Sequence, residues 1–518
     1  MTRHFGKVLS AQPNLLDAHI ITVEADYTHG IHAFSIVGLP DKAVEEARDR
    51  VGAALKNSGF SSPKHSNKKV VISLAPASVK KEGALFDVPI ALSYLLASEE
   101  IEFDATSRLF VGELGLDGSA RAIHGALPIT RSAQEAGILE VYVPMQNVSE
   151  AARIAGIAVY GYESLAQLIT HINTKPREDS DIRTGSVLQK ATQGNSRGKS
   201  VQLSNTLDEI LGQHHAKRGL MIAAAGGHNI AFFGPPGTGK TMLARALASI
   251  LPDLTDDEAI TVHSIHSVAG IARDSSDLTP PFRTPHHTGS YVSIVGGGAI
   301  PKPGEVTLAH RGVLFLDEFA EFEPKVINSL RQPLEDGLVT ISRARGSVRF
   351  PSRFILVAAL NPCPCGHGEG PRCTCSAHAI QKYQRKISGP IMDRIDMWVE
   401  VLPVSHDALM DTRRNESVET EQARTHVQHA RTAQKLRYAQ ETFSLNSELS
   451  ARTLNSHITL TEHQKSILKK AADRLHLSPR GIHRVMRVSR TIADLEGSSA
   501  ITDAHMLEAL QYRAQLQT

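Results

Sequence analysis

The chain has 518 residues, of which 41% are hydrophobic and 21% charged, and its formal net charge at pH 7 is +2 with an isoelectric point of about 8.3. This length predicts about three domains with cores of their own, while the balanced charge excludes a chain-wide field for nucleic acid, so any polyanion binding must be local. We expect no signal peptide and no membrane span, since no apolar run approaches roughly 18 residues, and four closely spaced cysteines argue against a disulfide scaffold and favour a cytoplasmic location.

The N-terminal region, residues 1–172, is predicted to be an α/β domain. Its expected strands are 70–74, 108–112 and 141–143, and its expected helices are 42–56, 88–97 and 122–136. Residues 173–204 are rich in Lys, Arg, Asp, Ser, Thr, Gln and Gly and poor in apolar residues. This composition predicts a flexible linker.

A phosphate-binding loop begins the next domain, which we expect to span residues 205–401. An apolar run meets G-x-x-x-x-G-K-T, formed by Gly234, Pro235, Pro236, Gly237, Thr238, Gly239, Lys240 and Thr241. The glycines let backbone N–H groups point at phosphate, the lysine can reach the β- and γ-oxygens, and the final threonine can offer its hydroxyl to Mg²⁺. Helical spacing over 242–251 places the phosphates at a helix N-terminus. The pattern predicts an ATP site.

Two carboxylates at the end of a second apolar run supply the other half of a nucleotide site. Residues 312–316 precede Asp317 and Glu318. We expect Asp317 to hold Mg²⁺ and Glu318 to orient the attacking water. The alternative, a buried strand with a polar end, is unfavourable because adjacent carboxylates are costly there unless a cation or water uses them.

A basic hairpin is predicted at 338–350, where two strand-like runs flank Arg343, Arg345 and Gly346. Arginines at its tip could contact the phosphates of a DNA strand with little sequence preference. The alternative is a solvated hairpin with ordinary edge charges.

Four cysteines form two C-x-C pairs, Cys363 with Cys365 and Cys373 with Cys375. Four thiolates in a short turn suit tetrahedral Zn²⁺, although C-x-C is less diagnostic than C-x-x-C. Reduced free thiols are the alternative, and His367 or His378 could replace a cysteine. His286 and His287 could also be ligands, but a lone His-His pair is more often hydrogen-bonded structure.

The C-terminal region, residues 402–518, is predicted to be helical, with helix-like periodicity at 420–440, 461–475 and 502–515.

Six motifs together resemble the magnesium-chelatase-like AAA+ ATPases of ComM/YifB type, from near the first residue almost to the last. They are FSIVGLP at 34–40, SLAPA at 73–77, GGHN at 226–229, FRTPHHT at 282–288, NPCPCG at 361–366 and SGPIMDRID at 388–396. The resemblance implies a Lon-protease-like N-terminal α/β domain, a P-loop AAA+ α/β core and a C-terminal α-helical lid. It also implies a ring, with a hexamer expected, in which neighbouring subunits share each ATP site.

The same resemblance implies roles for three further residues. Asn361 matches sensor 1, which helps to place the lytic water, and Arg480 matches the sensor 2 arginine of the lid. Arg394 matches the arginine finger that completes the neighbour's site and neutralises charge on the γ-phosphate. For each arginine alone, a surface ion pair is the alternative. The extra chain between the P-loop helix and Asp317, which includes residues 283–290 and 296–298, falls where the chelatase and replicative-helicase branch of AAA+ proteins has an insertion that points toward the pore of the ring.

The N-terminal domain lacks the catalytic pair of the Lon-type proteases that it resembles. Leu85 occupies the position of the serine nucleophile and Pro128 that of the lysine, and neither side chain can do nucleophilic or proton-transfer chemistry. We expect a protease-dead domain that serves assembly or DNA engagement.

Together these features predict an ATP-driven DNA translocase that promotes branch migration in natural transformation or related recombination. Its expected cofactors are ATP, Mg²⁺ and structural Zn²⁺. Its expected partners are single-stranded and branched DNA, its own copies in a homo-hexamer and recombination proteins, with no membrane. The alternative is a chelatase-like ATPase that remodels a protein or metal-insertion complex; the chain lacks the D-x-S-x-S metal-adhesion domain of partner chelatase subunits. An ATP-dependent protease is excluded by the missing Ser-Lys pair.

Overall fold

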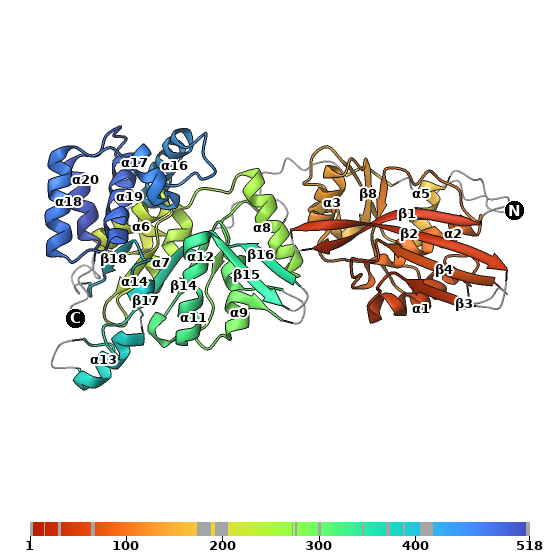
Figure 1. Cartoon of the computed structure of the whole chain (residues 1–518), viewed down its shortest axis with the longest axis horizontal. Helices are drawn as coiled ribbons and strands as arrows, with labels where there is room; N and C mark the ends of the chain where they lie inside the picture. The colour runs from red at the N-terminus through yellow and green to blue at the C-terminus, as the bar shows by residue number, and fades with distance from the viewer. Residues whose placement is uncertain are drawn as a thin grey trace. The chain divides into compact units, whose positions relative to one another are not determined.

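The structure is a computed structural model that describes residues 4–14, 16–29, 33–63, 68–173, 188–191, 206–271, 273–274, 277–298, 302–343, 346–368, 373–386, 389–404 and 418–513. Two compact units make up the chain, Met1–Gly198 with Ala259–Asp277, and Lys199–Glu258 with Leu278–Thr518. Each unit contains a sheet with parallel strands and helices packed on it (Figure 1), which confirms the predicted α/β class.

A seven-stranded sheet forms the centre of the first unit, in the order β3-β4-β2-β1-β5-β8-β9. Its strands are β1 (Phe5–Asn14), β2 (Asp17–His29), β3 (Ala33–Val37), β4 (Lys68–Ala75), β5 (Arg108–Phe110), β8 (Glu140–Pro144) and β9 (Ala158–Tyr162). β1 and β2 form an antiparallel hairpin, and β5, β8 and β9 extend the sheet from β1 as parallel strands. The predicted strands correspond to β4, β5 and β8. The long hairpin was not predicted, although buried and exposed residues alternate along much of β1, as expected for a strand with one buried face.

Helices cover this sheet, namely α1 (Lys42–Asn57), α2 (Asp87–Ala97), α3 (Ala126–Glu135), α4 (Val148–Ala151) and α5 (Leu165–Ile172). The same unit also contains a small antiparallel ribbon of β6 (Glu113–Leu114) and β7 (Ala120–Arg121). α1 begins after Asp41, whose Oδ1 accepts a hydrogen bond from the Val44 backbone N at 2.8 Å. α3 begins at Ala126 rather than Ala122, because Gly125 has a φ of +82° and lies in the left-handed region.

The helix α8 (Asp256–Val268) leads from the second unit into the first. From Ala259 to Asp277 the chain belongs to the first unit, although the segment follows the P-loop in sequence and was expected within residues 205–401. There the Gly125 backbone N donates a hydrogen bond to Ser267 Oγ at 3.0 Å. Arg153 NH1 also lies 2.8 Å from His263 Nε2. Burial lowers the pKa of His263 to about 4.

Part of the predicted linker is also attached to the first unit. Leu188 is buried in its core, and the Ala191 backbone N donates a hydrogen bond to the Val159 carbonyl oxygen of β9 at 2.9 Å. The rest of 173–204 lies outside the described residues, apart from 173 and 189–190.

The second unit is built on a five-stranded parallel sheet in the order β11-β14-β17-β10-β18. These strands are β11 (Phe282–Arg283), β14 (Val313–Leu316), β17 (Ile355–Leu360), β10 (Ile230–Phe233) and β18 (Met397–Glu400). In register, Phe233 pairs with Leu360 on one side and with Glu400 on the other, so the carboxyl ends of three strands lie together. Ligands bind at this edge in open α/β sheets.

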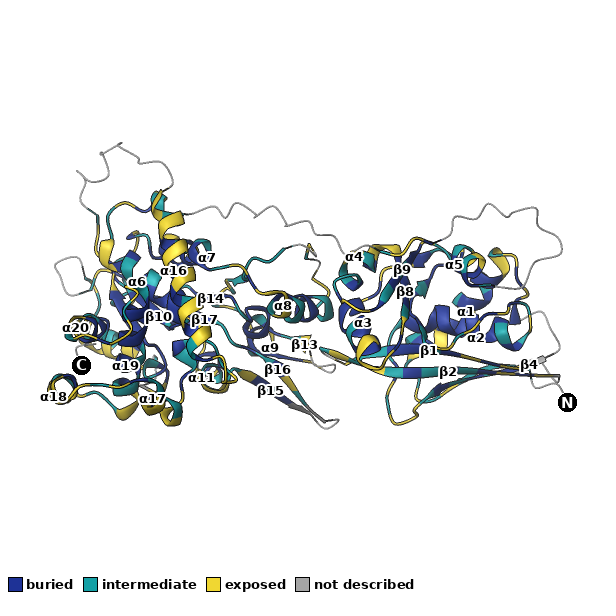
Figure 2. Cartoon of the chain, turned by 90° about the horizontal axis from the view of Figure 1, so that it is seen from above, coloured by how far each residue is buried: buried dark blue, intermediate teal, exposed yellow. Residues whose placement is uncertain are grey.

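Short helices and two ribbons surround this sheet, whose central strands are buried (Figure 2). The helices are α6 (His214–Gly226), α7 (Lys240–Ile250), α9 (Tyr291–Val295), α10 (Glu305–Leu308), α11 (Pro324–Ser329), α12 (Arg331–Asp336), α13 (Ala377–Lys386) and α14 (Gly389–Met392). The ribbons are β12 (Gly296–Gly297) with β13 (Lys302–Pro303), and β15 (Leu338–Arg343) with β16 (Gly346–Pro351). The predicted helix at 242–251 corresponds to α7.

The C-terminal region is helical, as predicted. It contains α16 (Val418–Arg437), α17 (Ala451–His457), α18 (Glu462–Arg474), α19 (Pro479–Leu495) and α20 (Asp503–Gln511). Three of these match predicted helices, whereas α17 and α19 were not predicted. α19 begins where Ser478 Oγ accepts a hydrogen bond from the Gly481 backbone N and Pro479 occupies the first turn.

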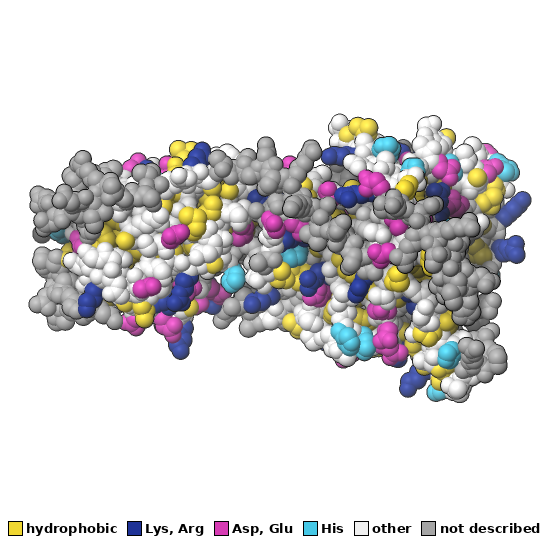
Figure 3. Space-filling view, turned by 180° about the vertical axis from the view of Figure 1, so that it is seen from behind, with side chains coloured by type: hydrophobic (Ala, Val, Ile, Leu, Met, Phe, Trp, Pro, Cys, Tyr) yellow, Lys and Arg dark blue, Asp and Glu magenta, His cyan; other side chains and the backbone are white. Residues whose placement is uncertain are grey.

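The surface mixes charges of both signs. On the face drawn in Figure 3, Lys and Arg side chains lie among Asp and Glu side chains, in keeping with the net charge of +2. No helix in the described part of the chain has both the length and the apolar character needed to cross a membrane.

Candidate nucleotide-binding site

The glycine-rich loop joins the end of β10 to the start of α7. Gly234 has a φ of +155°, and a Cβ there would lie 2.2 Å from the Val401 carbonyl oxygen, so a side chain would displace the neighbouring backbone. Gly237 and Gly239 have φ values of +76° and +89°, in the left-handed region that favours glycine. The sequence therefore folds here into the tight turn that was predicted between strand and helix.

Lys240 points back into the loop and is 9% exposed. Its Nζ donates hydrogen bonds to the carbonyl oxygens of Gly234 and Pro235 at 2.7 and 2.8 Å, and to Asn361 Oδ1 at 3.1 Å. Burial lowers the pKa of Lys240. A cation held over the inside of this loop by carbonyl oxygens fits a phosphate group, which could replace those oxygens.

Thr241 and Asp317 lie together across two elements. Thr241 is on α7, Asp317 follows β14, and Thr241 Oγ1 donates to Asp317 Oδ2 at 2.9 Å. The other carboxylate oxygen of Asp317 accepts a hydrogen bond from the Glu318 backbone N at 2.9 Å. A hydroxyl and a carboxylate oxygen are hard ligands of the kind that Mg²⁺ takes beside nucleotide phosphates, so the pair fits the predicted metal site.

Glu318 has a partner that was not predicted. Its backbone adopts a φ of +51°, and its Oε2 lies 3.2 Å from Nδ1 of His287. His287 belongs to the insertion, and its ring packs edge-on against Phe322 and beside His286. His286 Nδ1 in turn meets Thr288 Oγ1 at 2.8 Å. Both histidines are thus hydrogen-bonded or ion-paired, the alternative that competed with a metal-ligand role.

The expected arginine finger, Arg394, and the expected sensor 2 arginine, Arg480, share one carboxylate. NH2 of Arg394 lies 2.5 Å from Glu335 Oε1, and NH1 of Arg480 lies 3.1 Å from the same oxygen. The guanidinium of Arg394 is 7% exposed and also donates to the Pro390 carbonyl oxygen. Its hydrogen bond and positive charge lower the pKa of Glu335.

Arg394, Arg480 and Glu335 line a cavity of about 720 Å³ between the sheet domain and the helical region of the second unit. Residues 234–241 are not among those that line it. Arg480 is exposed and makes the surface ion pair that was the alternative to its expected role, whereas the ion pair of Arg394 is formed by a buried side chain. The two pairs bring the arginines together at Glu335. No sequence pattern marked Glu335, because its contacts join residues far apart in the chain.

The basic hairpin is present as β15 and β16, with Arg343 paired in register with Gly346. Arg345 and the side chain of Arg343 lie outside the described residues. Their contact with DNA stays a prediction.

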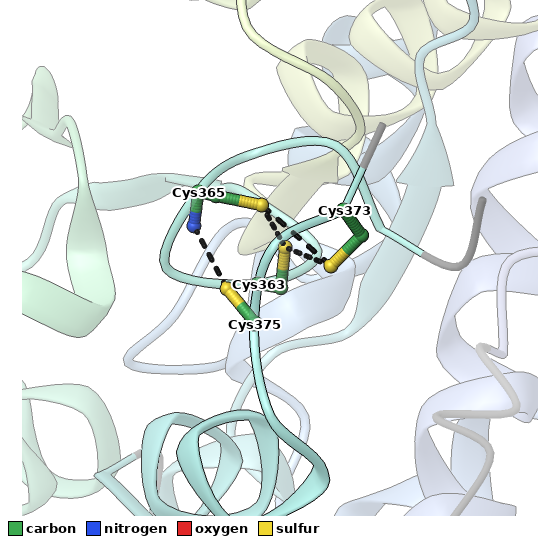
Figure 4. Close-up of side chains that lie close together, drawn as sticks. All are labelled: Cys363, Cys365, Cys373 and Cys375. Atoms are coloured by element: carbon green, nitrogen blue, oxygen red, sulfur yellow. Dashed lines mark hydrogen bonds between the residues drawn. The ribbon is translucent and has the colours of Figure 1, made fainter. Parts of the chain in front are cut away.

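The four cysteines lie in one cluster (Figure 4), with every sulfur within 4.8 Å of the others. They form the one metal-capable group of three or more His, Cys, Asp or Glu found among the described residues, and neither His367 nor His378 is part of it.

In the first unit, Leu85 lies in a short 3-10 helix and Pro128 in α3, and both are buried. These are packing positions, and the expected loss of protease chemistry stays a prediction. The nearby Lys81 is fully buried, with its Nζ donating to the carbonyl oxygens of Gly38 and Pro76.

Comparison with known proteins matches the chain to three family models along its length. They are "Subunit ChlI of Mg-chelatase" over residues 23–147, "Magnesium chelatase, subunit ChlI" over 206–409 and "Magnesium chelatase, subunit ChlI C-terminal" over 417–513. The chain is 42% identical to Competence protein ComM of Haemophilus influenzae over 96% of its own length and 95% of that protein. It is 37% identical to the uncharacterised protein YifB of Salmonella typhimurium, again over 96% and 95%. A magnesium-chelatase 38 kDa subunit of Acidiphilium rubrum is 25% identical over 57% of this chain and 86% of that protein.

Proposed function

Because the chain belongs to the magnesium-chelatase-like AAA+ ATPases of ComM and YifB type, we propose that it is a DNA translocase driven by ATP hydrolysis. In this proposal it assembles into a homo-hexameric ring in the cytoplasm. It promotes branch migration of single-stranded and branched DNA during natural transformation and homologous recombination, alongside recombination proteins and without a membrane partner.

The observation that carries the ATPase part is the joint placement of Lys240, Asn361, Thr241 and Asp317 at the carboxyl ends of adjacent parallel strands. ATP with Mg²⁺ supplies the phosphoanhydride bond whose hydrolysis releases the free energy for movement. Lys240 would exchange its two carbonyl partners for phosphate oxygens, and Thr241 with Asp317 would hold the cation. Glu318 would orient the attacking water, and Asn361 would help to place it.

Arg394 would complete the site of a neighbouring subunit, and Arg480 would serve as the sensor 2 arginine of the lid. They meet at Glu335, on a cavity that the P-loop of the same chain does not line. A guanidinium held there can contact a nucleotide phosphate only if the nucleotide is bound by another subunit or if the chain rearranges. The first route needs no rearrangement of the sheet, and it supports the ring.

Two observations support DNA as the substrate along which the protein moves. One is the relative of 42% identity whose name is competence protein, competence being the state in which a bacterium takes up DNA. The other is the hairpin of β15 and β16, whose sequence carries Arg343, Arg345 and Arg349. Arginines at such a tip would bind the phosphate backbone with little preference for base sequence.

Strand exchange on a mobile three- or four-stranded DNA junction, with purified protein and Mg-ATP, tests the proposal. Product that depends on ATP and that Lys240→Ala cannot make is expected. ATP turnover that is indifferent to any DNA, with no product, would favour the second candidate, a chelatase-like ATPase that remodels a protein or metal-insertion complex. The partial match to the chelatase subunit supports that candidate, although it covers only 57% of this chain.

A further inference from the structure

All four cysteines of the chain converge on one point (Figure 4). The Cys363 sulfur lies 3.3 Å from that of Cys365 and 3.8 Å from that of Cys373, and the last two are 3.6 Å apart. The Cys375 sulfur completes the group within 4.8 Å. Since residues 363–365 and 373–375 are separate segments of the chain, this meeting is made by the fold and not by sequence neighbours alone.

The spacing of the sulfurs fits a tetrahedral metal better than a disulfide. With Zn–S bonds of about 2.3 Å, tetrahedral geometry places sulfurs about 3.8 Å apart, whereas bonded sulfurs are about 2.05 Å apart. The cysteines are free, and the separations among the sulfurs of Cys363, Cys365 and Cys373, 3.3 to 3.8 Å, lie near the first value. Four soft thiolates with no carboxylate among them select Zn²⁺ over Mg²⁺ or Ca²⁺.

Backbone N–H groups already point at two of the sulfurs. The Gly368 N donates to Cys363 Sγ at 3.3 Å, and the Cys365 N donates to Cys375 Sγ at 3.4 Å. Such hydrogen bonds stabilise negative charge on sulfur and fix the orientation of metal ligands. The loop therefore has both the ligands and their supporting donors.

The same loop holds the proposed nucleotide site at two points. Asn361, two residues before Cys363, accepts the hydrogen bond from Lys240 Nζ at 3.1 Å. Gly366 lies against the P-loop so closely that a Cβ there would be 2.9 Å from Pro236 Cδ, and its φ of +84° also favours glycine.

The helix that follows the cysteine loop also contacts the region around Asn361. α13 follows Cys375, and its buried Tyr383 lies near the backbone of Asn361. Further along α13, Lys386 Nζ donates to Glu321 Oε2 at 3.0 Å, just after Asp317 and Glu318 in sequence. A metal bound by both residues 363–365 and residues 373–375 would thus restrain the position of Asn361 from both ends of the loop.

We propose that the four cysteines bind one Zn²⁺, and that the bound metal fixes Asn361 and the loop around Pro236 so that nucleotide binding by the P-loop depends on it. This inference rests on the proposed ATP site and adds the metal that controls it. Without the metal the two segments are free to separate, and Asn361 loses its fixed position opposite Lys240. Because coupling between two ligands is reciprocal, bound nucleotide must in turn strengthen the hold on zinc.

The first measurement is the metal content of the full chain purified under reducing conditions. One zinc per chain is expected, released when a thiol reagent modifies the cysteines. Cys373→Ser should lose it, whereas His378→Ala, which changes an exposed neighbour outside the cluster, should keep it. No zinc in the parent chain, or zinc that survives Cys373→Ser together with Cys375→Ser, would overturn the site.

The second measurement tests the coupling without relying on a variant that could fail to fold. Zinc is removed from the parent chain by a chelator and restored, and the affinity for a fluorescent ATP analogue is measured in each state. We expect the affinity to fall about tenfold without metal and to recover with it, and the bound analogue to raise the zinc affinity, measured by equilibrium competition with the chelator, by the same factor.

Equal affinity with and without zinc would overturn the coupling while leaving the metal site intact. Neither readout needs DNA or ATP turnover, so failure of the proposed translocase activity is seen separately in the strand-exchange assay. If the analogue does not bind even to the zinc-loaded chain, the proposed ATP site fails, and the proposed coupling fails with it.

Discussion

Replacing His287 by Ala is expected to raise the rate of ATP hydrolysis in the absence of DNA. His287 Nδ1 lies 3.2 Å from Oε2 of Glu318, the carboxylate proposed to orient the attacking water. The ring is held in this place by its edge-on contact with Phe322. While it is paired with His287, Glu318 is less available to the water, so loss of the ring should release it.

The size of the effect follows from the exposure of the pair. The side chains of His287 and Glu318 are 31% and 52% exposed, and solvent-screened pairs of this kind contribute about 0.2–1 kcal/mol. Since about 1.4 kcal/mol corresponds to a tenfold change in rate, kcat should rise about 1.5- to 5-fold. KM should change by less than about twofold, because Glu318 is not expected to hold the nucleotide in the ground state.

Steady-state ATP hydrolysis by the parent chain, His287→Ala and His286→Ala checks this, with and without single-stranded DNA. His286→Ala is the matched control, since that ring faces Thr288 and has the same chemistry one residue away. We expect a higher basal rate and a smaller DNA stimulation in His287→Ala alone. A basal rate at or below that of the parent, with KM unchanged, would refute the view that His287 restrains Glu318.

Three further predictions concern the same unit. Lys240→Ala should lose nucleotide binding while Glu318→Gln should bind a fluorescent ATP analogue and fail to turn over; normal hydrolysis by both variants would contradict the site. Mixed assemblies of Arg394→Ala and Lys240→Ala subunits should regain part of the activity, and no recovery in assemblies of normal size would mean that Arg394 does not act on a neighbour. Arg394 lowers the pKa of Glu335 below its ordinary value of 4.5, so their ion pair stabilises the fold fully above that value and is lost as the pH falls through the lowered pKa. Thermal unfolding from pH 7 to pH 3 should therefore lose less stability in Glu335→Gln than in the parent, and parallel losses would argue against the pair.

The features that could be predicted from the sequence are those that depend on residues close together along the chain. The loop around Lys240 needs glycines at fixed positions because its backbone takes left-handed φ values at those residues. Its conformation can therefore be predicted from its sequence. The strand before Asp317 is four apolar residues buried in the middle of a parallel sheet, and such a strand reads as a continuous apolar run. The hairpin at 338–351 could be placed because a turn signal separates two strand-like runs.

The features that the sequence did not predict depend on residues that are distant along the chain. The partners of Glu318, Arg394 and Arg480 became visible only in the fold, since neither His287 nor Glu335 belongs to a recognisable spacing with them. The segment Ala259–Asp277 follows the P-loop helix in sequence but packs in the first unit, which periodicity cannot reveal. α19 was not predicted either, and two of its arginines, Arg484 and Arg490, are buried and form ion pairs with Asp396 and Asp494 at 2.7 and 3.0 Å.

Three separate contacts bear on the proposed nucleotide site, and each is weak alone. Asn361 reaches Lys240 from the cysteine loop, His287 reaches Glu318 from the insertion, and Arg394 is held by Glu335 until a stronger anion competes for it. A contact of about 1 kcal/mol, the net contribution of an ordinary hydrogen bond, changes a rate by about fivefold, so no one of them can act as a complete switch. Acting together they can, provided that metal, DNA and the neighbouring subunit each set one contact. Such a motor would hydrolyse ATP slowly as a free chain and quickly only when all three conditions are met.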